Sequence, residues 1–247
     1  MGNILKVDYL WFYKNMDIEY EKRKKINKDL DHDALKVGIG GKISPEKDEH
    51  QYKLRMQKRK EIQRERLKIR DDKKGLIIVF TGNGKGKTTA ALGMAIRTLG
   101  HMEKVVIIQF IKGSWETGEE KAFKNFSNNI RWHSLGEGFT WETQDRIRDE
   151  KLVKEAWELA KSYIKKNEFK LVILDEINIA IKLGYINSDE IIDFIGNLEN
   201  KNNNHIVLTG RGAPDTIIKF ADLVTEMNLI KHPFKDQGIK AQKCIEF

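Results

Sequence analysis

The segment Phe80–Thr89, FTGNGKGKTT, has the composition of a phosphate-binding loop but not its usual spacing. The usual pattern is Gly, four residues, then Gly-Lys-Ser/Thr. Here the residue five places before Gly86 is Thr81, and the first glycine, Gly82, comes one position later. A short apolar run, GLIIVF, precedes the loop, and a helical pattern, KTTAALGMAIRTLG, follows it. This context predicts a phosphate loop between a buried strand and a helix, one residue shorter than usual.

Further apolar runs with turn residues around them recur downstream and predict more buried strands. They are KVVIIQF (104–110), KLVILDE (170–176), HIVLTG (205–210) and, more weakly, DLVTEM (222–227). Helical patterns separate the runs. Between residues 144 and 166 the apolar positions fall on one helical face, made of Val153, Ala156, Trp157, Ala160 and Ile164. Strands that alternate with helices predict an α/β fold of the P-loop NTPase type, with a doubly wound, mostly parallel sheet and helices on both faces.

The composition divides the chain into three parts. Residues 1–48 show no sustained periodicity and are expected to form a poorly ordered extension. Residues 49–74 read as a basic N-terminal helix, rich in helix formers but with a sparse apolar stripe. Residues 75–247 form the α/β domain. The first 74 residues hold 21 Lys and Arg against 14 Asp and Glu, whereas residues 75–247 hold 24 against 23.

Charge and hydropathy argue against two classes of function, nucleic-acid binding and insertion in a membrane. Because the excess positive charge belongs to the extension and the domain is nearly neutral, we do not expect nucleic acid as a partner of the whole protein. No apolar run approaches the roughly 20 residues of a membrane helix, and the N-terminus lacks the features of a targeting signal. The single cysteine, Cys244, is compatible with a reducing compartment. We therefore expect a cytoplasmic protein without membrane contact.

The loop and a second acidic element predict an ATP site with Mg²⁺. Glycine turns let backbone N–H groups face an anion, so we expect the loop to bind ATP through Gly82, Asn83, Gly84, Lys85, Gly86, Lys87, Thr88 and Thr89. Lys87 supplies a positive charge to the phosphates, and Thr88 supplies a hydroxyl to the metal. The run LVILDE ends in Asp175 and Glu176, carboxylates at the end of a predicted strand beside the loop.

Several long segments resemble the ATP:corrinoid adenosyltransferases, in the bacterial phosphate-loop class of cob(I)alamin adenosyltransferases. The similarity covers nearly all of residues 75–247, and the basic helix resembles the family's N-terminal helix. The segments that carry the resemblance are VFTGNGKGKTTAALGMAIR, QFIKGSW, GFTWETQD, VILDEIN, LTGRGAP and IKAQKCIEF. The family has the same shortened loop, which implies that the loop holds the triphosphate as a leaving group while C5′ of the ribose faces the corrinoid.

The resemblance also implies the reaction and its participants. Co(I) of a reduced corrinoid attacks C5′ of ATP, forming adenosylcobalamin or adenosylcobyrinic acid diamide and releasing triphosphate. Lys87, Thr88 and Glu176 are the implied catalytic residues, and Mg²⁺ is expected at Thr88, Asp175 and Glu176. Phe139, Trp141 and Arg211 are the implied corrinoid contacts. A reduced flavin or a flavodoxin-like protein is the implied electron donor, and a homodimer the implied assembly.

Other interpretations of the same residues stay open. A nucleic-acid-stimulated ATPase would use both the phosphate loop and the basic extension, and a nucleotide-dependent carrier would bind a corrinoid without forming the Co–C bond. From the sequence alone, core packing is the better interpretation of Phe139 and Trp141, and only the resemblance favours ligand contact. Arg211 fits a turn-stabilising role as well as a contact to phosphate or substrate.

Overall fold

In the computed structural model, the described residues are 49–68, 74–111, 117–126, 128–135, 145–198 and 203–245. They fall into two compact units, residues 1–73 and residues 74–247. In the first unit, helix α2 (Glu49–Lys68) is rich in Lys, Arg, Glu and Gln, and an ion pair of 2.8 Å joins Lys53 to Glu49 one turn away. The second unit contains all the strands of the described chain.

A six-stranded sheet with the order β3-β2-β4-β5-β1-β6 forms the centre of the second unit, and every neighbouring pair is parallel. The predicted doubly wound fold is therefore confirmed. Five strands correspond to the predicted apolar runs, and β3 was not predicted. The strands are β1 (Ile77–Thr81), β2 (Val105–Gln109), β3 (Ile130–Ser134), β4 (Leu171–Asp175), β5 (His205–Thr209) and β6 (Leu223–Glu226).

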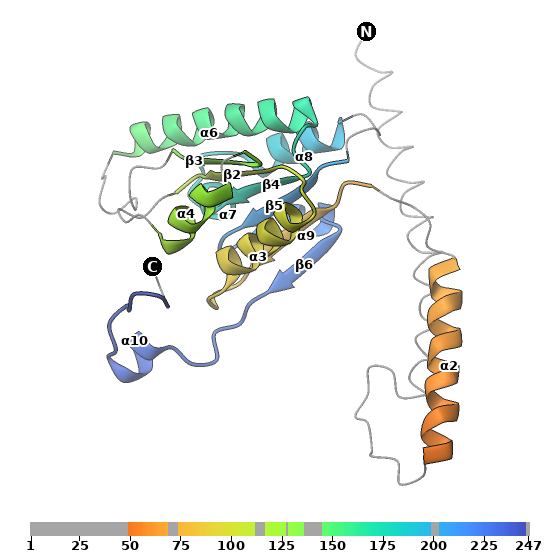
Figure 1. Ribbon diagram of the computed structural model, residues 1–247. Coiled ribbons are helices and arrows are strands. Elements are labelled where there is room, and N and C mark those ends of the chain that lie inside the picture. Colours follow the sequence, from red (N-terminus) through yellow and green to blue (C-terminus); the bar gives the residue numbers. More distant parts are fainter. Residues whose placement is uncertain are drawn as a thin grey trace. The chain divides into compact units, whose positions relative to one another are not determined.

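Two hydrophobic layers cover the two faces of this sheet. Along β2, Val106 and Ile108 point into one layer, whereas Val105 and Ile107 point into the other, because side chains alternate along a strand. Helices α6 (Arg146–Lys166), α7 (Ile177–Lys182), α8 (Ser188–Gly196) and α9 (Asp215–Phe220) pack on the first face. Helices α3 (Lys87–Gly100) and α4 (Gly118–Phe123) pack on the second. Figure 1 shows α6 and α8 on one side of the sheet and α3 on the other.

Local sequence signals set the ends of these helices. Asp145 caps α6 by accepting a hydrogen bond from Arg148 N, and Asn167 ends it in a left-handed conformation. All five apolar residues predicted for one face of this helix are buried. Helix α3 begins at Lys87, directly after Gly86. The 3-10 helix η1 (Lys124–Phe126) follows α4, and α10 (Pro233–Gln237) follows β6. Because β1 ends at Thr81 and α3 begins at Lys87, the phosphate loop lies at the carboxyl edge of the sheet.

Candidate functional site

The ammonium group of Lys87 lies inside the loop that precedes it. Its Nζ donates to the carbonyl oxygens of Gly82 at 3.0 Å and Gly84 at 2.5 Å, and only 6% of the residue is exposed. Burial lowers the pKa of Lys87, and the Glu176 carboxylate opposes this shift. The cation is thus held where the phosphates of a nucleotide would enter the loop.

The backbone of Met227, just after β6, braces the short loop from outside. Gly84 N donates to Met227 O at 2.6 Å, and Met227 N donates to Thr81 O at 2.8 Å. A Cβ atom at Gly84 would lie 2.7 Å from Met227 O, and one at Gly82 would lie 2.5 Å from the same atom. Gly82 also has a φ of 93°, which disfavours other residues. These glycines therefore permit a close contact between the phosphate loop and Met227, the residue that follows edge strand β6.

Asp175 joins the loop helix to the neighbouring strands. Its Oδ1 accepts hydrogen bonds from Thr88 Oγ1 at 2.9 Å and from Thr209 Oγ1 at 2.7 Å. Its Oδ2 accepts from Gln109 Nε2 at 3.1 Å. The carboxylate is 3% exposed, and these donors offset the cost of its burial. Since the Thr88 hydroxyl donates its proton to Asp175, the oxygen lone pairs of Thr88 remain for another ligand.

Glu176 is held in an unusual backbone conformation beside this network. Its φ is 60°, and its backbone N donates to Thr209 Oγ1 at 2.9 Å. Among the described residues, its buried Oε2 has no hydrogen-bond partner. Burial and the neighbouring Asp175 carboxylate raise the pKa of Glu176 to about 7, against the opposing effects of Lys87 and Arg211. A buried carboxylate oxygen without a donor is suited to bind a cation.

The predicted site residues thus divide into three groups. Residues 82–89, Asp175 and Glu176 meet at the carboxyl edge of the sheet. Arg211 is exposed and close enough to affect the pKa of both Lys87 and Glu176, which places it beside the loop. Phe139 and Trp141 lie outside the described residues.

Three residues contribute to this site without having been predicted from the sequence. Gln109 and Thr209 are the polar last residues of apolar strands, the same position that Asp175 occupies in β4, so this signal was present in the sequence. Met227 acts through its backbone atoms, and no pattern of residue types predicts such a contact.

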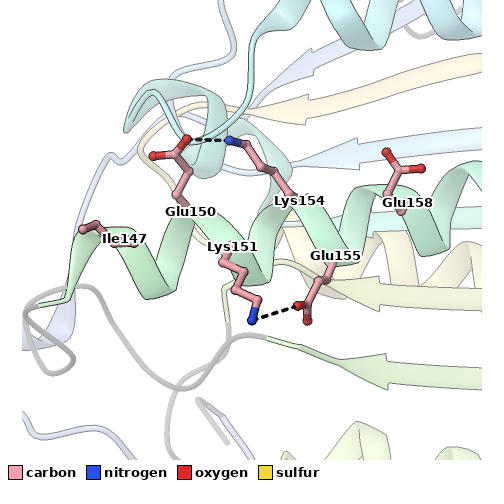
Figure 2. A pocket seen from close by; sticks show the side chains of 6 residues that line it. All are labelled: Ile147, Glu150, Lys151, Lys154, Glu155 and Glu158. Carbon is pink, nitrogen blue, oxygen red and sulfur yellow. Dashed lines mark hydrogen bonds and ion pairs between the residues drawn. The ribbon is translucent and has the colours of Figure 1, made fainter.

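A separate depression lies on the solvent-facing side of α6 (Figure 2). The described residues that line it all come from this one helix: Ile147, Glu150, Lys151, Lys154, Glu155 and Glu158. Their charges pair along the helix, with Lys154 Nζ 2.7 Å from Glu150 Oε1 and Lys151 Nζ 3.9 Å from Glu155 Oε1. Among the described residues no second element contributes a group to it, so we assign it no ligand. No helix in the described part of the chain is long and apolar enough to cross a membrane.

Known proteins resemble this chain over the same region. Residues 73–247 match the family described as ATP:corrinoid adenosyltransferase BtuR/CobO/CobP. A corrinoid adenosyltransferase of Sinorhizobium sp is 47% identical, over 85% of this chain and 97% of the relative. Those of Pseudomonas aeruginosa and Escherichia coli K12 are 47% and 38% identical, over 83% and 81% of this chain and 98% and 99% of the relatives.

Among solved structures, the flagellar accessory protein FlaH from Methanocaldococcus jannaschii aligns with a TM-score of 0.44 and 14% identity, over 62% of this chain and 70% of that one. The family match over residues 73–247 includes the phosphate loop, both acidic residues and Met227. The chain belongs to the ATP:corrinoid adenosyltransferase family.

Proposed function

We propose that this protein transfers the 5′-deoxyadenosyl group of ATP to the Co(I) of a corrinoid and releases triphosphate. The observation that carries the proposal is the family match over residues 73–247, which includes every described element of the phosphate site. The products would be adenosylcobalamin or adenosylcobyrinic acid diamide. A nucleic-acid-stimulated ATPase would also need a phosphate loop, but membership of this family does not favour it.

The reaction needs position and charge more than acid–base chemistry. The electron pair of Co(I) forms the Co–C5′ bond, the C5′–O bond breaks, and its electron pair leaves on the triphosphate, so cobalt becomes formally Co(III). No proton is removed from the nucleophile. The loop from Gly82 to Thr89 would hold the triphosphate, and Lys87 would stabilise the negative charge of the leaving group.

The oxygen atoms at the site fit a divalent cation such as Mg²⁺. The described residues contain no group of three or more His, Cys, Asp or Glu side chains that could hold a metal. Mg²⁺ does not require one, because it binds through one or two protein oxygens together with phosphates and water. Thr88 Oγ1 and the unpartnered Oε2 of Glu176 would hold it, with Asp175 alongside. When bound, the ion neutralises phosphate charge.

Further parts of the proposal rest on the family resemblance. Phe139, Trp141 and Arg211 would contact the corrinoid, and Lys87, Thr88 and Glu176 would act in catalysis. A reduced flavin or a flavodoxin-like protein would deliver the electron that produces Co(I). We also propose a homodimer that works in the cytoplasm. Replacing Phe139 or Trp141 by Ala should lower adenosylation and leave ATP binding intact, and loss of ATP binding would instead assign these residues to the core.

The decisive experiment is an anaerobic reaction with ATP and chemically reduced cobalamin, followed by absorbance and by phosphorus NMR. One intact triphosphate should appear for each Co–C bond formed, because the bond that breaks lies at C5′. Triphosphate has a central phosphorus resonance that a mixture of ADP and orthophosphate lacks. ADP and orthophosphate as the stoichiometric products, with turnover stimulated by DNA or RNA, would contradict the proposal.

A further inference from the structure

A series of hydrogen-bonded polar side chains runs along the carboxyl ends of the strands, from β3 to the phosphate loop. On β3, Ser134 Oγ donates to Gln109 Oε1 at 2.7 Å, and Trp132 Nε1 donates to the same oxygen at 3.2 Å. Gln109, at the end of β2, then donates from Nε2 to Asp175 Oδ2 at 3.1 Å. Only 8% of Gln109 is exposed. Donors on one side and a carboxylate on the other leave a single favourable orientation for this amide.

The Gln109 amide donates to the carboxylate oxygen of Asp175 that neither threonine contacts. Thr88 and Thr209 both donate to Oδ1, whereas Gln109 donates to Oδ2. Without the Gln109 donor, the buried carboxylate would lose a hydrogen bond and could turn about its Cβ–Cγ bond. The Thr88 hydroxyl would then lose the acceptor that directs its proton away from the loop.

We propose that Gln109 is a positioning residue for the nucleotide-bound metal. It holds the Asp175 carboxylate, which orients the Thr88 hydroxyl so that its lone pairs face the cation of MgATP. This inference rests on the proposed function, because it assumes that Thr88 binds the metal. A leucine at position 109 would supply no donor, and a glutamate would place a second negative charge against Asp175. Groups hydrogen-bonded directly to a metal ligand typically change metal affinity by about 10- to 100-fold when they are removed, and Gln109 acts through one further hydrogen bond, so its effect belongs at the lower end of that range.

The test measures ATP binding without a corrinoid, so that no adenosyl transfer occurs. ATP binding is measured over a range of Mg²⁺ concentrations for the wild-type protein, Gln109→Leu, Gln109→Glu and Ser134→Ala. We expect Gln109→Leu to raise the Mg²⁺ concentration for half-maximal ATP binding by about tenfold. ATP affinity in excess EDTA should stay within about twofold of wild type. Ser134→Ala, which removes one donor to Gln109 but not the Asp175 contact, should shift the Mg²⁺ requirement less and in the same direction.

Asn204→Leu is the matched control for loss of a buried amide. Asn204 is also largely buried, and its Nδ2 donates to Ile164 O at 3.2 Å, next to the amino end of β5 and away from the phosphate loop. This variant should lose thermal stability without changing the Mg²⁺ requirement. Should Gln109→Leu fail to fold, the isosteric Gln109→Glu at pH 8 provides the same comparison, with an expected shift at least as large.

The outcomes separate the inference from the function on which it rests. If the wild-type protein binds ATP in a Mg²⁺-dependent way but folded Gln109 variants have the same Mg²⁺ requirement, Gln109 is structural and the inference is wrong. If Asn204→Leu shifts the requirement as much as Gln109→Leu, the effect reflects general destabilisation and the inference is again wrong. If the wild-type protein shows no Mg²⁺-dependent ATP binding at all, the inference is wrong, and the anaerobic reaction with ATP and reduced cobalamin decides the proposed function separately.

Discussion

At the scale of single residues, the conformation of the phosphate loop depends on the Lys87 ammonium group and on the lack of a side chain at Gly82 and at Gly84. Lys87 is enclosed by carbonyl oxygens of its own loop, and Gly82 and Gly84 leave room for the backbone of Met227. The Gly84 amide donates to Met227 O, so it contributes to the shape of the loop. The shortened spacing is therefore accompanied by a contact to a segment far along the chain, and the residues of the loop alone do not define its conformation.

Lys87→Ala should reduce ATP affinity by about 10- to 100-fold while the protein remains folded, because a hydrogen bond to a charged group contributes roughly 1.5–3 kcal/mol. Calorimetric ATP binding and circular dichroism measure the two effects. Lys104→Ala is the control, because Lys104 is exposed and immediately precedes β2. It therefore lies at the amino ends of the strands, whereas the phosphate loop lies at their carboxyl ends. Equal ATP affinity in the Lys87 and Lys104 variants would remove the phosphate-loop assignment.

Gly84→Ala should weaken ATP binding and lower the melting temperature, because its Cβ would lie 2.7 Å from a backbone carbonyl that cannot move without disturbing β6. Gly93→Ala is the matched substitution. Gly93 lies within α3, and a Cβ there would meet nothing within 4 Å. That variant should be more stable by about 1 kcal/mol, the helix-propensity difference between Gly and Ala. Thermal denaturation of both proteins tests the contrast, and a stabilised Gly84→Ala would disprove the brace.

At the scale of elements, the parallel sheet places polar strand ends beside one another. Residues Gln109, Asp175 and Thr209 are the last residues of β2, β4 and β5, which are neighbours in the sheet. At the amino ends of the strands, Leu76 N, just before β1, donates a hydrogen bond to His205 Nδ1 at 3.1 Å. This contact requires a neutral imidazole at the start of β5.

The His205 contact predicts acid sensitivity. Burial, and secondarily the Lys170 ammonium, lower the pKa of His205 from its ordinary value of 6.5. As pH falls through about 6.5, the unfolded chain takes up a proton that the folded protein resists, so stability is lost towards acid pH. His205→Asn keeps an acceptor but does not titrate, so its melting temperature should fall less between pH 7 and pH 5. Parallel profiles for the variant and the wild type would contradict this prediction.

At the scale of the whole molecule, the described phosphate site lies within the second unit. The chain divides between residues 1–73 and 74–247, and the family match begins at residue 73. Lys74, at the start of the second unit, has its Nζ 2.5 Å from Asp222 Oδ1. A truncation that keeps Lys74 therefore preserves this ion pair and tests the contribution of the preceding helix alone.

Deleting residues 1–45 should leave adenosylation largely unchanged, whereas deleting residues 1–73 should reduce it on the order of tenfold. The reason is that α2 resembles the family's N-terminal helix, which we expect to cover the corrinoid. Both truncated proteins should bind ATP as the full chain does, because the phosphate loop and its brace lie in residues 74–247. ATP titration and the anaerobic adenosylation assay distinguish these effects. Equal adenosylation by the two truncations would exclude a covering role for α2.

The sequence by itself determined the fold class, the phosphate loop, the acidic pair and the family. These features are encoded in contiguous residues: an apolar run, a glycine-rich turn with Lys87, and a strand that ends in Asp175 and Glu176. It did not predict β3, in which only Ile130 is buried and Arg131 and His133 interrupt the apolar pattern at the sheet edge. An edge strand lacks the continuous apolar run of a strand that is covered on both faces.

Only the tertiary structure decided the order of the strands and the partners of the site residues. Met227 braces Gly84, and Gln109 holds Asp175, because the parallel sheet brings distant segments to one edge. These contacts depend on which strands are neighbours and on backbone atoms that every residue type carries. Local patterns of residue types specify neither, since the pairing of strands follows from packing of the whole sheet between its two helical layers.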